Sequence, residues 1–444
     1  MKYHIWTEGC QMNLADSQRV ASELEKLGYR ATRDVESADV IVLNTCVVRQ
    51  SAEDKAYGRL MSLKPLKESR PDLVLGLMGC LVGVRDPAPL RNRFPFVDVF
   101  LPPSDPTNLV DLLRSRDGGA SASEDHQIEQ RETEARFALQ DADFVLPAHE
   151  RGDLVSAHVP IIYGCNHVCT FCVIPYRRGR ERSRSIGEIA AEIHALVNQG
   201  VKEVTLLGQI VDRYGYDVGD GPRLPDLLRA VHDIDALERI RFLTSHPLYM
   251  TGDLLEAVAS LPKVCEHIEV PVQAGDDEVL RRMKRGYTVD DYRRLIGQIR
   301  DRVPNVSIGT DIIVGMPGET EREFEGTCAL LLELELDVAH IAMFSPRPNT
   351  VAARWEDNVP AEEKERRRKA LDDLQAKIVA KINRKSLGQT VEVLVEEKNK
   401  QRWKGRTRNN KLVFFEDDSR DWKGRLAHIK VNWTGPWSMI GTVA

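Results

Sequence analysis

Long apolar runs are missing from this chain of 444 residues. No stretch approaches the roughly 18 consecutive apolar residues that a membrane-spanning helix needs. The first ten residues, MKYHIWTEGC, carry charged side chains and lack the apolar segment of a signal peptide. We therefore expect a soluble cytoplasmic protein that neither spans nor binds a membrane.

An excess of positive charge is also missing. Lys and Arg number 62 against 68 Asp and Glu, which gives a formal net charge of −6. This balance argues against a globally basic nucleic-acid binder but leaves room for a local basic surface. Hydrophobic residues make up 42% and charged residues 29% of the chain, so it can bury a sizeable core. The length suggests roughly three domains.

The first third of the chain alternates short apolar strands with amphipathic helices. We expect strands at Tyr3–Trp6, Val40–Leu43 and Leu73–Leu77, with helices at Ala15–Leu27 and Ala52–Leu63 between them. This βαβαβ pattern predicts an α/β, Rossmann-like domain with a parallel sheet over residues 1–115. Residues 116–151 change to a Gly- and Ser-rich and then acidic, Gln-rich composition, which predicts a linker that is partly disordered at its start.

A second alternating region covers residues 152–385. Helical patterns, including Ile186–Gln199, Asp290–Val303, Arg322–Leu334 and Ala361–Lys385, separate the strand candidates or follow them. The six candidates are His158–Ile162, Glu203–Leu207, Arg239–Thr244, His267–Val270, Val306–Val314 and Val338–Phe344. Six βα units predict a partial (β/α)6 barrel, whose catalytic groups lie just beyond the carboxyl ends of its strands.

The last part, residues 386–444, has no helical period. Its short alternating strands predict a small β-barrel of the oligonucleotide-binding (OB-like) kind, at Thr390–Glu396, Trp403–Arg406, Leu412–Phe415, Leu426–Val431 and Met439–Val443. Lys and Arg number 11 here against 7 Asp and Glu, and four of the six tryptophans are present. A basic, Trp-rich barrel favours contact with RNA over the alternative of a solvated structural barrel.

Cysteine is scarce, and its eight occurrences are better suited to metal or redox chemistry than to disulfides in a reducing compartment. Cys165, Cys169 and Cys172 form a C-x₃-C-x₂-C run directly after the first expected barrel strand. Three thiolates leave one iron of an iron–sulfur cube open, and open positions are typical of catalytic metals. The alternatives are unrelated thiols or a structural zinc site completed by His158 or His167.

A second set of three cysteines is spread along the first domain. Cys10, Cys46 and Cys80 are separated by 36 and 34 residues, and each follows an expected strand. Because the carboxyl ends of parallel strands lie side by side, three thiols there can converge on one ligand. The alternative is that these three are buried core cysteines. Cys265 and Cys328 lie on apolar patterns, and we predict that those two belong to the core.

These motifs resemble one family. The cysteine run is similar to the signature of radical S-adenosylmethionine (SAM) enzymes, and its context resembles the methylthiotransferases, nearest their tRNA-adenosine (MiaB) branch. The matching segments are Glu8–Asn13, Asn44–Arg49, Gly164–Arg184, Met283–Thr288, Thr310–Thr320 and Phe344–Pro348. The resemblance covers nearly the whole chain and implies a radical-SAM barrel in the centre and a TRAM domain at the end.

The resemblance implies two [4Fe–4S] clusters, one on Cys165, Cys169 and Cys172 and an auxiliary one on Cys10, Cys46 and Cys80. SAM, bound at the first cluster, would yield the radical that activates C2 of N6-isopentenyl-adenosine beside the anticodon of tRNA. The auxiliary cluster would supply sulfur, and a second SAM its methyl group. We also expect contact with the anticodon stem-loop, an electron donor such as flavodoxin or ferredoxin, and a monomer.

Several polar residues lie at or near expected strands. By position, Gln209, Gln273 and Asp311 are candidates for contact with SAM or the nucleotide, although a glycine after a strand, as at Gly208, also marks an ordinary turn. Five arginines between Arg177 and Arg184 are candidates for tRNA phosphates or the SAM carboxylate, with a solvated face as the alternative.

One departure from the family's pattern bears on the substrate. The tRNA branch usually has two asparagines after the glutamine, whereas this chain reads Gln209-Ile210-Val211-Asp212. Threonylcarbamoyl-adenosine of tRNA is therefore the closest competing substrate, ahead of a ribosomal-protein aspartate. Outside this family, the alternatives are a non-enzymatic iron–sulfur RNA-binding protein and an electron carrier, and open clusters argue against the first.

Overall fold

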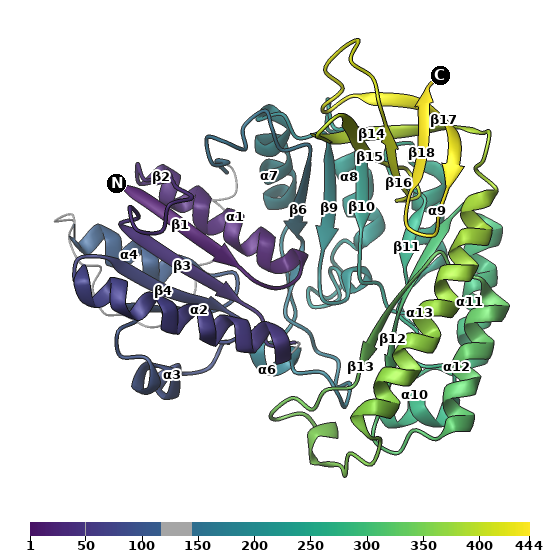
Figure 1. The fold of residues 1–444 in the computed structure, drawn as a ribbon, viewed down its shortest axis with the longest axis horizontal. Coiled ribbons are helices and arrows are strands. Elements are labelled where there is room, and N and C mark those ends of the chain that lie inside the picture. Colours follow the sequence, from purple (N-terminus) through teal and green to yellow (C-terminus); the bar gives the residue numbers. More distant parts are fainter. Residues whose placement is uncertain (49, 117–143) are drawn as a thin grey trace. The chain divides into compact units, whose positions relative to one another are not determined.

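The computed structural model describes residues 1–48, 50–116 and 144–444 (Figure 1). Most of the predicted linker and Arg49 of a family motif lie outside the described residues. The chain divides into two compact units. The first unit comprises Met1–Asp153, Ala157–His167 and Val173–Gly200, and the second comprises Leu154–Ser156, Val168–Cys172 and Val201–Ala444. Among the described residues, no helix has the length and apolar character needed to cross a membrane.

The first unit contains the parallel sheet that the sequence predicts. Its strand order is β2-β1-β3-β4-β5, and every pairing is parallel. The strands are β1 (Lys2–Thr7), β2 (Arg30–Ala31), β3 (Val40–Thr45), β4 (Val74–Gly79) and β5 (Val99–Leu101). The two edge strands, β2 and β5, were not predicted.

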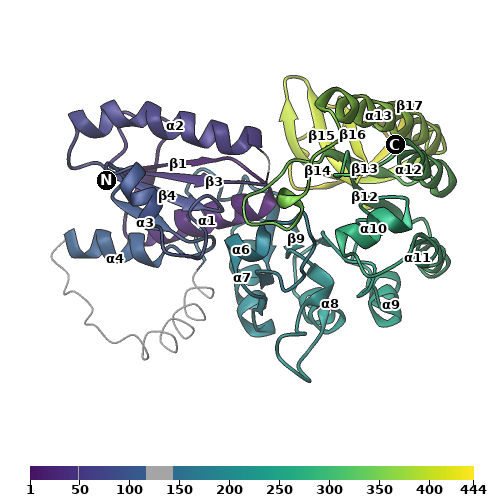
Figure 2. The ribbon, with the colours of Figure 1, turned by 90° about the horizontal axis from the view of Figure 1, so that it is seen from below.

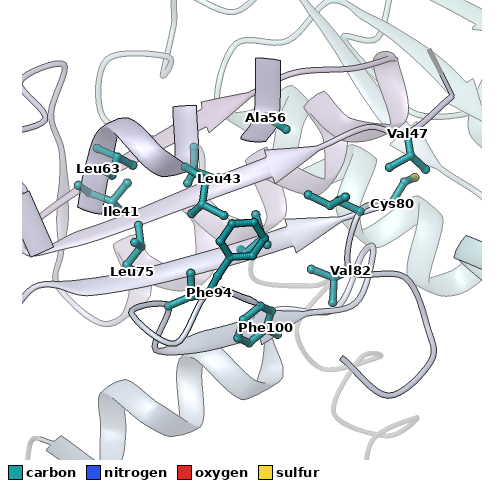
Figure 3. Close-up of a cluster of buried hydrophobic side chains, with 14 of the residues drawn as sticks. Ile41, Leu43, Val47, Ala56, Leu63, Leu75, Cys80, Val82, Phe94 and Phe100 are labelled. Atoms are coloured by element: carbon teal, nitrogen blue, oxygen red, sulfur yellow. The ribbon is translucent and has the colours of Figure 1, made fainter. Parts of the chain in front are cut away.

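Helices cover both faces of this sheet, which explains why β3 and β4 are buried along their whole length (Figure 2). Alternate residues of β3 enter two different cores: Ile41 and Leu43 pack with α2 (Gln50–Ser69), and Val40 and Val42 pack with α1 (Gln11–Lys26) and α4 (Thr107–Arg116). Figure 3 shows the first of these cores, which also includes Phe94 after the short helix α3 (Ala88–Arg93). Burial on both faces is the usual pattern of parallel strands.

The segment around the cysteine run differs from the prediction. The expected strand His158–Ile162 is wrong in its bounds, because β6 spans Ser156–Pro160 and ends at the proline. Proline has no N–H to continue a ladder. The next residues form β7 (Ile162–Tyr163), which pairs antiparallel with β8 (Arg182–Ser183). The helices α6 (Ile174–Arg178) and α7 (Ile186–Asn198) complete this part of the first unit.

The second unit continues the predicted alternation of strands and helices. Strands β9 and β10 pair in parallel, and so do β11, β12 and β13. The strands are β9 (Glu203–Leu207), β10 (Arg239–Phe242), β11 (His267–Glu269), β12 (Ser307–Val314) and β13 (Val338–Met343). The helices are α8 (Leu224–His232), α9 (Gly252–Ser260), α10 (Asp277–Met283), α11 (Val289–Arg302), α12 (Glu321–Leu334) and α13 (Ala361–Arg384), with short 3₁₀ turns at Val211–Arg213 and Ala352–Arg354.

A closed five-stranded barrel ends the chain, as predicted. Its order is β14-β15-β16-β18-β17, with β16 and β18 parallel and the other pairs antiparallel. The strands are β14 (Thr390–Asn399), β15 (Arg402–Thr407), β16 (Leu412–Phe415), β17 (Leu426–Thr434) and β18 (Met439–Val443). Trp403 and Trp422 pack in its core, whereas Trp433 and Trp437 are 50% and 63% exposed.

Two buried arginines of β10 join the barrel to the rest of the second unit. The guanidinium of Arg239 donates to Glu392 of β14 at 2.7 Å. That of Arg241 donates to the carbonyl oxygen of Thr407 at 2.8 Å and to Glu203 of β9 at 2.9 Å. Because backbone carbonyls accept these bonds, the barrel is bound through its main chain as well as through charge.

Candidate functional site

Cys10, Cys46 and Cys80 lie at one edge of the parallel sheet of the first unit. Cys46 directly follows β3 and Cys80 directly follows β4, while Cys10 precedes the first turn of α1, shortly after β1. Strands β1, β3 and β4 are parallel neighbours, so their carboxyl ends meet at the same edge.

The loops that carry these three cysteines touch one another. The N–H of Cys80 donates to the carbonyl oxygen of Thr45 at 2.9 Å. A Cβ built on Gly9 would lie 2.9 Å from the Cβ of Cys46. The Cys80 thiol is close enough to Cys10 and Cys46 for both to influence its pKa. The structure therefore brings together three thiols that are far apart in sequence. Cys80 also borders the apolar core, beside Val47 (Figure 3).

Two fully buried asparagines hold these loops in place. The side-chain amide of Asn13 donates to Asn44 Oδ1 at 3.0 Å and to the Thr45 carbonyl at 3.1 Å, and Asn44 donates back to the Asn13 carbonyl at 2.8 Å. The Cys10 thiol donates to Asn13 Oδ1 at 3.4 Å. Gly79 has a φ of +97°, and a Cβ there would lie 2.5 Å from Asn44 Oδ1, so this close approach requires glycine.

A buried arginine completes this group. The guanidinium of Arg178 donates to Asp16 at 3.0 Å and to Ser104 at 3.3 Å. Burial raises the pKa of Cys80 to about 11, and the charge of Arg178 opposes that rise. Arg178 and Arg184 are buried, Arg184 against Glu192 at 2.6 Å, so the alternative of a solvated face is wrong for these two, and their burial argues against contact with tRNA phosphates.

The first cysteine of the C-x₃-C-x₂-C run belongs to the first unit. The N–H of Cys165 donates to the Gly179 carbonyl at 3.0 Å, and Asn166 exchanges hydrogen bonds with Glu181. Gly164 has a φ of +70°, and a Cβ there would lie 2.0 Å from the carbonyl oxygen of Arg180. The backbone entering the run can therefore be formed only with glycine at position 164.

The other two cysteines of the run belong to the second unit. The N–H of Cys172 donates to the carbonyl oxygen of Cys169 at 3.1 Å, which makes a tight turn between them. The guanidinium of Arg285 donates to Cys169 Sγ at 3.4 Å and to the Tyr287 hydroxyl at 3.0 Å. Arg285 is buried, and its charge is held beside the thiol by the Pro271 carbonyl at 3.2 Å.

Arg285 and Tyr287 were not among the predicted site residues. They lie in the segment Met283–Thr288, whose similarity to a known family gave the signal. The same segment binds the cysteine run through its main chain, because Thr170 N–H donates to the Met283 carbonyl at 3.2 Å.

Hydrogen bonds link neighbouring strand ends of the second unit. After β9 and β10, the Thr244 hydroxyl donates to the Gly208 carbonyl at 2.7 Å. After β11 and within β12, the N–H of Gln273 donates to the Asp311 carbonyl at 2.9 Å. The predicted residues Gln273 and Asp311 are thus adjacent, and half-buried Gln209 lies next to Gly208.

Backbone strain marks the same strand ends. Thr244 and Gln273 have φ values of 68° and 76°, in the left-handed region that favours glycine. Such residues cost on the order of 1–3 kcal/mol and cluster at functional sites. Both observations favour a binding site at these carboxyl ends.

The donor atoms are not arranged for a single metal ion. Within residues 1–48, 50–116 and 144–444, no three side chains of His, Cys, Asp or Glu are grouped closely enough to hold one. In a [4Fe–4S] cube each thiolate binds a different iron, so its three ligands are spaced more widely than those of one zinc ion. Thiol groups such as these are the usual ligands of iron–sulfur clusters, and one of them, Cys169 Sγ, accepts a hydrogen bond from Arg285.

Three family models match the chain in order. They are the Uncharacterized protein family UPF0004 at residues 2–102, the Radical SAM superfamily at residues 159–331 and the TRAM domain at residues 384–444. A tRNA-2-methylthio-N(6)-dimethylallyladenosine synthase of Roseiflexus sp. (strain RS-1) is 49% identical over 447 residues, covering 100% of this chain and 90% of the relative. The chain belongs to this synthase family. A synthase of the same name from Herpetosiphon aurantiacus is 46% identical and covers 100% of this chain and 97% of the relative.

Similarity to solved structures extends to the fold. The radical S-adenosylmethionine methyltransferase TsrM from Kitasatospora setae, solved with cobalamin and a [4Fe–4S] cluster, superposes with a TM-score of 0.56. The match covers 79% of this chain and 73% of TsrM at 14% identity. This chain therefore shares the fold of TsrM. At this level of identity, the similarity does not indicate the substrate of this chain.

Proposed function

We propose that this protein is a radical-SAM methylthiotransferase that adds a methylthio group to C2 of N6-isopentenyl-adenosine next to the anticodon of tRNA. The observation that carries this proposal is the similarity over the whole chain to relatives named tRNA-2-methylthio-N(6)-dimethylallyladenosine synthase. The two sets of three cysteines support it, since each follows strand ends, and the Arg285 side chain donates to Cys169 of one set.

Cys165, Cys169 and Cys172 would hold one [4Fe–4S] cluster, and Cys10, Cys46 and Cys80 would hold the auxiliary one. When bound, the clusters and SAM supply the one-electron chemistry and the sulfur, as such cofactors do in other enzymes. The protein binds and orients these groups. Arg285 donates to Cys169 Sγ at 3.4 Å and so holds a positive charge beside one of the proposed ligands.

Three further residues are proposed to contact SAM or the nucleotide: Gln209, Gln273 and Asp311. Gln209 follows β9, and Gln273, which has a φ of 76°, donates through its N–H to the carbonyl oxygen of Asp311 within β12 at 2.9 Å. These positions support the proposal. The barrel at the chain's end is proposed to hold the anticodon stem-loop, with the exposed rings of Trp433 and Trp437 available for stacking on unpaired bases.

We propose domains at 1–115, 152–385 and 386–444, with a linker at 116–151. The three family-model matches support this division.

The substrate also bears on where the enzyme acts and on its partners. A tRNA substrate implies a cytoplasmic enzyme. An electron donor such as flavodoxin or ferredoxin would supply reducing equivalents, and we propose that the enzyme acts as a monomer.

The experiment that tests the substrate is nucleoside mass spectrometry of tRNA from cells with and without the gene. Loss of 2-methylthio-isopentenyl-adenosine, with accumulation of the isopentenyl precursor, is the expected result. Loss of the threonylcarbamoyl analogue instead would assign the sister substrate, which the Asp212 departure makes the main competitor. No change in either nucleoside would refute a tRNA substrate.

A purified-enzyme assay tests the division of labour between the two cysteine sets. The variant Cys10→Ala should lose methylthiolation and still cleave SAM to 5′-deoxyadenosine. The matched control is Cys328→Ala, a half-buried cysteine on α12, which should retain both reactions. Methylthiolation by Cys10→Ala would remove Cys10 from the proposed sulfur-donating site.

A further inference from the structure

Three exposed arginines lie close together in the sequence of the first unit. Arg85 follows the turn after Cys80, and Arg91 and Arg93 lie on α3. Between residues 81 and 97 the only carboxylate is that of Asp86, so this segment carries local positive charge within a chain that is acidic as a whole. A local charge of this sign on the surface attracts anions.

Two of these arginines lie over aromatic rings. The guanidinium carbon of Arg93 is 4.4 Å from the centre of the Tyr57 ring and 5.2 Å from that of the Phe94 ring. The guanidinium carbon of Arg85 is 5.8 Å from the centre of the Tyr176 ring. Both tyrosines are half-buried, whereas both arginines are exposed. The face of a ring attracts a cation without neutralising it, so each guanidinium is held in place and keeps its charge.

The charge of these two arginines is not used in ion pairs. In the part of the chain that the structure describes, no carboxylate forms an ion pair with Arg85 or Arg93. On α13, by contrast, Arg366 and Arg368 each pair with two carboxylates. A guanidinium stacked on a ring keeps its planar N–H edge available, and this edge matches two oxygens of a phosphate group.

The turn that carries Arg85 begins at Cys80, one of the three cysteines at the edge of the parallel sheet. The Leu81 carbonyl of this turn accepts a hydrogen bond from Arg177 at 3.4 Å. Arg177 follows Tyr176 on α6, so the ring beneath Arg85 is tied to the same turn. Arg85 is therefore joined to the proposed auxiliary site by a short and well-bonded stretch of chain.

The rings beneath Arg93 belong to the core that this turn enters. Tyr57 and Phe94 stack with their ring centres 5.8 Å apart. Phe94 lies in the apolar core that also contains Val82 and Cys80 (Figure 3), and Tyr57 packs against it. Arg93 thus borders the same core of the first unit that Cys80 borders.

We propose that Arg85 and Arg93 bind backbone phosphates of the tRNA anticodon stem-loop. The inference rests on the proposed function, because it takes this RNA as the substrate and brings its target base to the auxiliary site. A base that reaches this site brings the neighbouring phosphates with it, since they are attached to it through the sugars. Phosphate contacts fix the register and orientation of a nucleic acid without reading its sequence. The two arginines therefore orient the substrate and do not select the base.

The measurement is the salt dependence of RNA binding. A fluorescent anticodon stem-loop that carries isopentenyl-adenosine is titrated with the full chain, loaded anaerobically with iron and sulfide, at about 50 to 200 mM salt. Each phosphate contact contributes about 0.7–0.9 to the slope of log Kd against the logarithm of the salt concentration. The variant Arg85→Gln/Arg93→Gln should therefore have a slope smaller by about 1.4–1.8. Its binding should be roughly 25- to 60-fold weaker at about 0.1 M salt, because the counterion contribution vanishes at about 1 M.

Two control variants separate a phosphate contact from other effects. Arg33→Gln removes another exposed arginine of the first unit, one that follows the edge strand β2, whereas Arg85 and Arg93 lie between β4 and the opposite edge strand β5 in the chain. Its slope should match that of the wild type. Arg85→Lys/Arg93→Lys keeps both charges and should also keep the slope of the wild type, because counterion release depends on charge.

The outcomes separate the two levels of the proposal. A wild type that does not bind the stem-loop overturns the proposed function and this inference together. A wild type that binds it, with the same slope as Arg85→Gln/Arg93→Gln, overturns the inference alone. An equal fall in slope for Arg33→Gln also overturns it, because only net charge would then be at work.

An acidic electron donor is the other partner that these arginines could bind. A double Gln variant that keeps the slope of the wild type but is reduced more slowly by flavodoxin would assign the arginines to that donor and overturn the inference. If the double variant does not fold, as judged by its Tm, Arg85→Gln alone takes its place. A slope smaller by about 0.7–0.9 then supports the inference, and an unchanged slope overturns it.

Discussion

Replacing Asp212 with asparagine should stabilise the protein at pH 8 and change its stability little in weak acid. Asp212 lies in the 3₁₀ turn after β9, is 4% exposed, and accepts hydrogen bonds from the His246 N–H at 3.1 and 3.0 Å. Burial raises the pKa of its carboxyl from 3.8 to about 8, although that N–H and the charges of Arg213 and Arg285 act to lower it. Asparagine keeps an acceptor oxygen for His246 and cannot ionise.

The magnitude follows from proton linkage. Between pH 4 and pH 8 the folded protein holds a proton on Asp212 that the unfolded chain has lost. The free energy of unfolding therefore falls as the pH rises through this window, by at most about 1.4 kcal/mol per pH unit. From pH 6 to pH 8 the wild type should lose up to about 3 kcal/mol that the Asp212→Asn variant keeps. Above pH 8 the difference should stay constant.

The assay is denaturant unfolding of wild type and variant at several pH values between 5 and 9, under anaerobic conditions. Other titrating groups cancel in the difference between the two proteins. The control is Asp220→Asn, which makes the same substitution at an exposed carboxyl a few residues along the same loop. Parallel curves for wild type and Asp212→Asn would refute the reasoning, because they would mean that Asp212 is ionised in the folded protein at all these pH values.

Three other substitutions test separate parts of the structure. Gly164→Ala should destabilise the first unit by roughly 3 kcal/mol or more, measured by thermal unfolding, since a Cβ would lie 2.0 Å from a backbone carbonyl oxygen at a φ of +70°; an unchanged Tm would contradict this geometry. Trp433→Ala with Trp437→Ala should weaken tRNA binding by about 1–3 kcal/mol per ring lost and leave Tm unchanged, as measured by filter binding and melting. Equal affinity would argue against stacking by these rings. Arg241→Met should cost about 3–5 kcal/mol in denaturant unfolding, because it leaves buried Glu203 without its partner at 2.9 Å; a loss below 1 kcal/mol would show that water reaches this pair.

Strands could be predicted from the sequence where their position depends only on a run of buried apolar residues. β3 and β4 are buried at every position, and their apolar parts, Val40–Leu43 and 74–78, appear as continuous runs in the sequence. β2 has two residues and β5 has three, and such short strands are defined by their neighbour in the sheet and not by their own pattern. The end of β6 at Pro160 shows the same limit, because a missing N–H decides a boundary that an apolar pattern crosses.

The same distinction applies to the candidate site. The place of Cys46 and Cys80 after their strands could be predicted, because strand ends and residue spacing are local properties of the sequence. The burial of Arg178 could not be predicted from the sequence. Its partner Asp16 is 162 residues away, and isolated charged residues are usually solvated. Asp212 was noticed only as a departure from the pattern of a family. Its pKa depends on burial, which only the folded chain shows.

The attachment of the terminal barrel through Arg239 and Arg241 limits how freely that barrel can be exchanged. Truncation before β14 would expose two cations whose acceptors, among them Glu392 and the Thr407 carbonyl, left with the deleted part. A chimera made from two relatives would need to exchange β10 together with the barrel, although the two are far apart in sequence. In protein engineering, and in any gene rearrangement that moves this barrel, the heritable module is thus larger than the compact barrel itself.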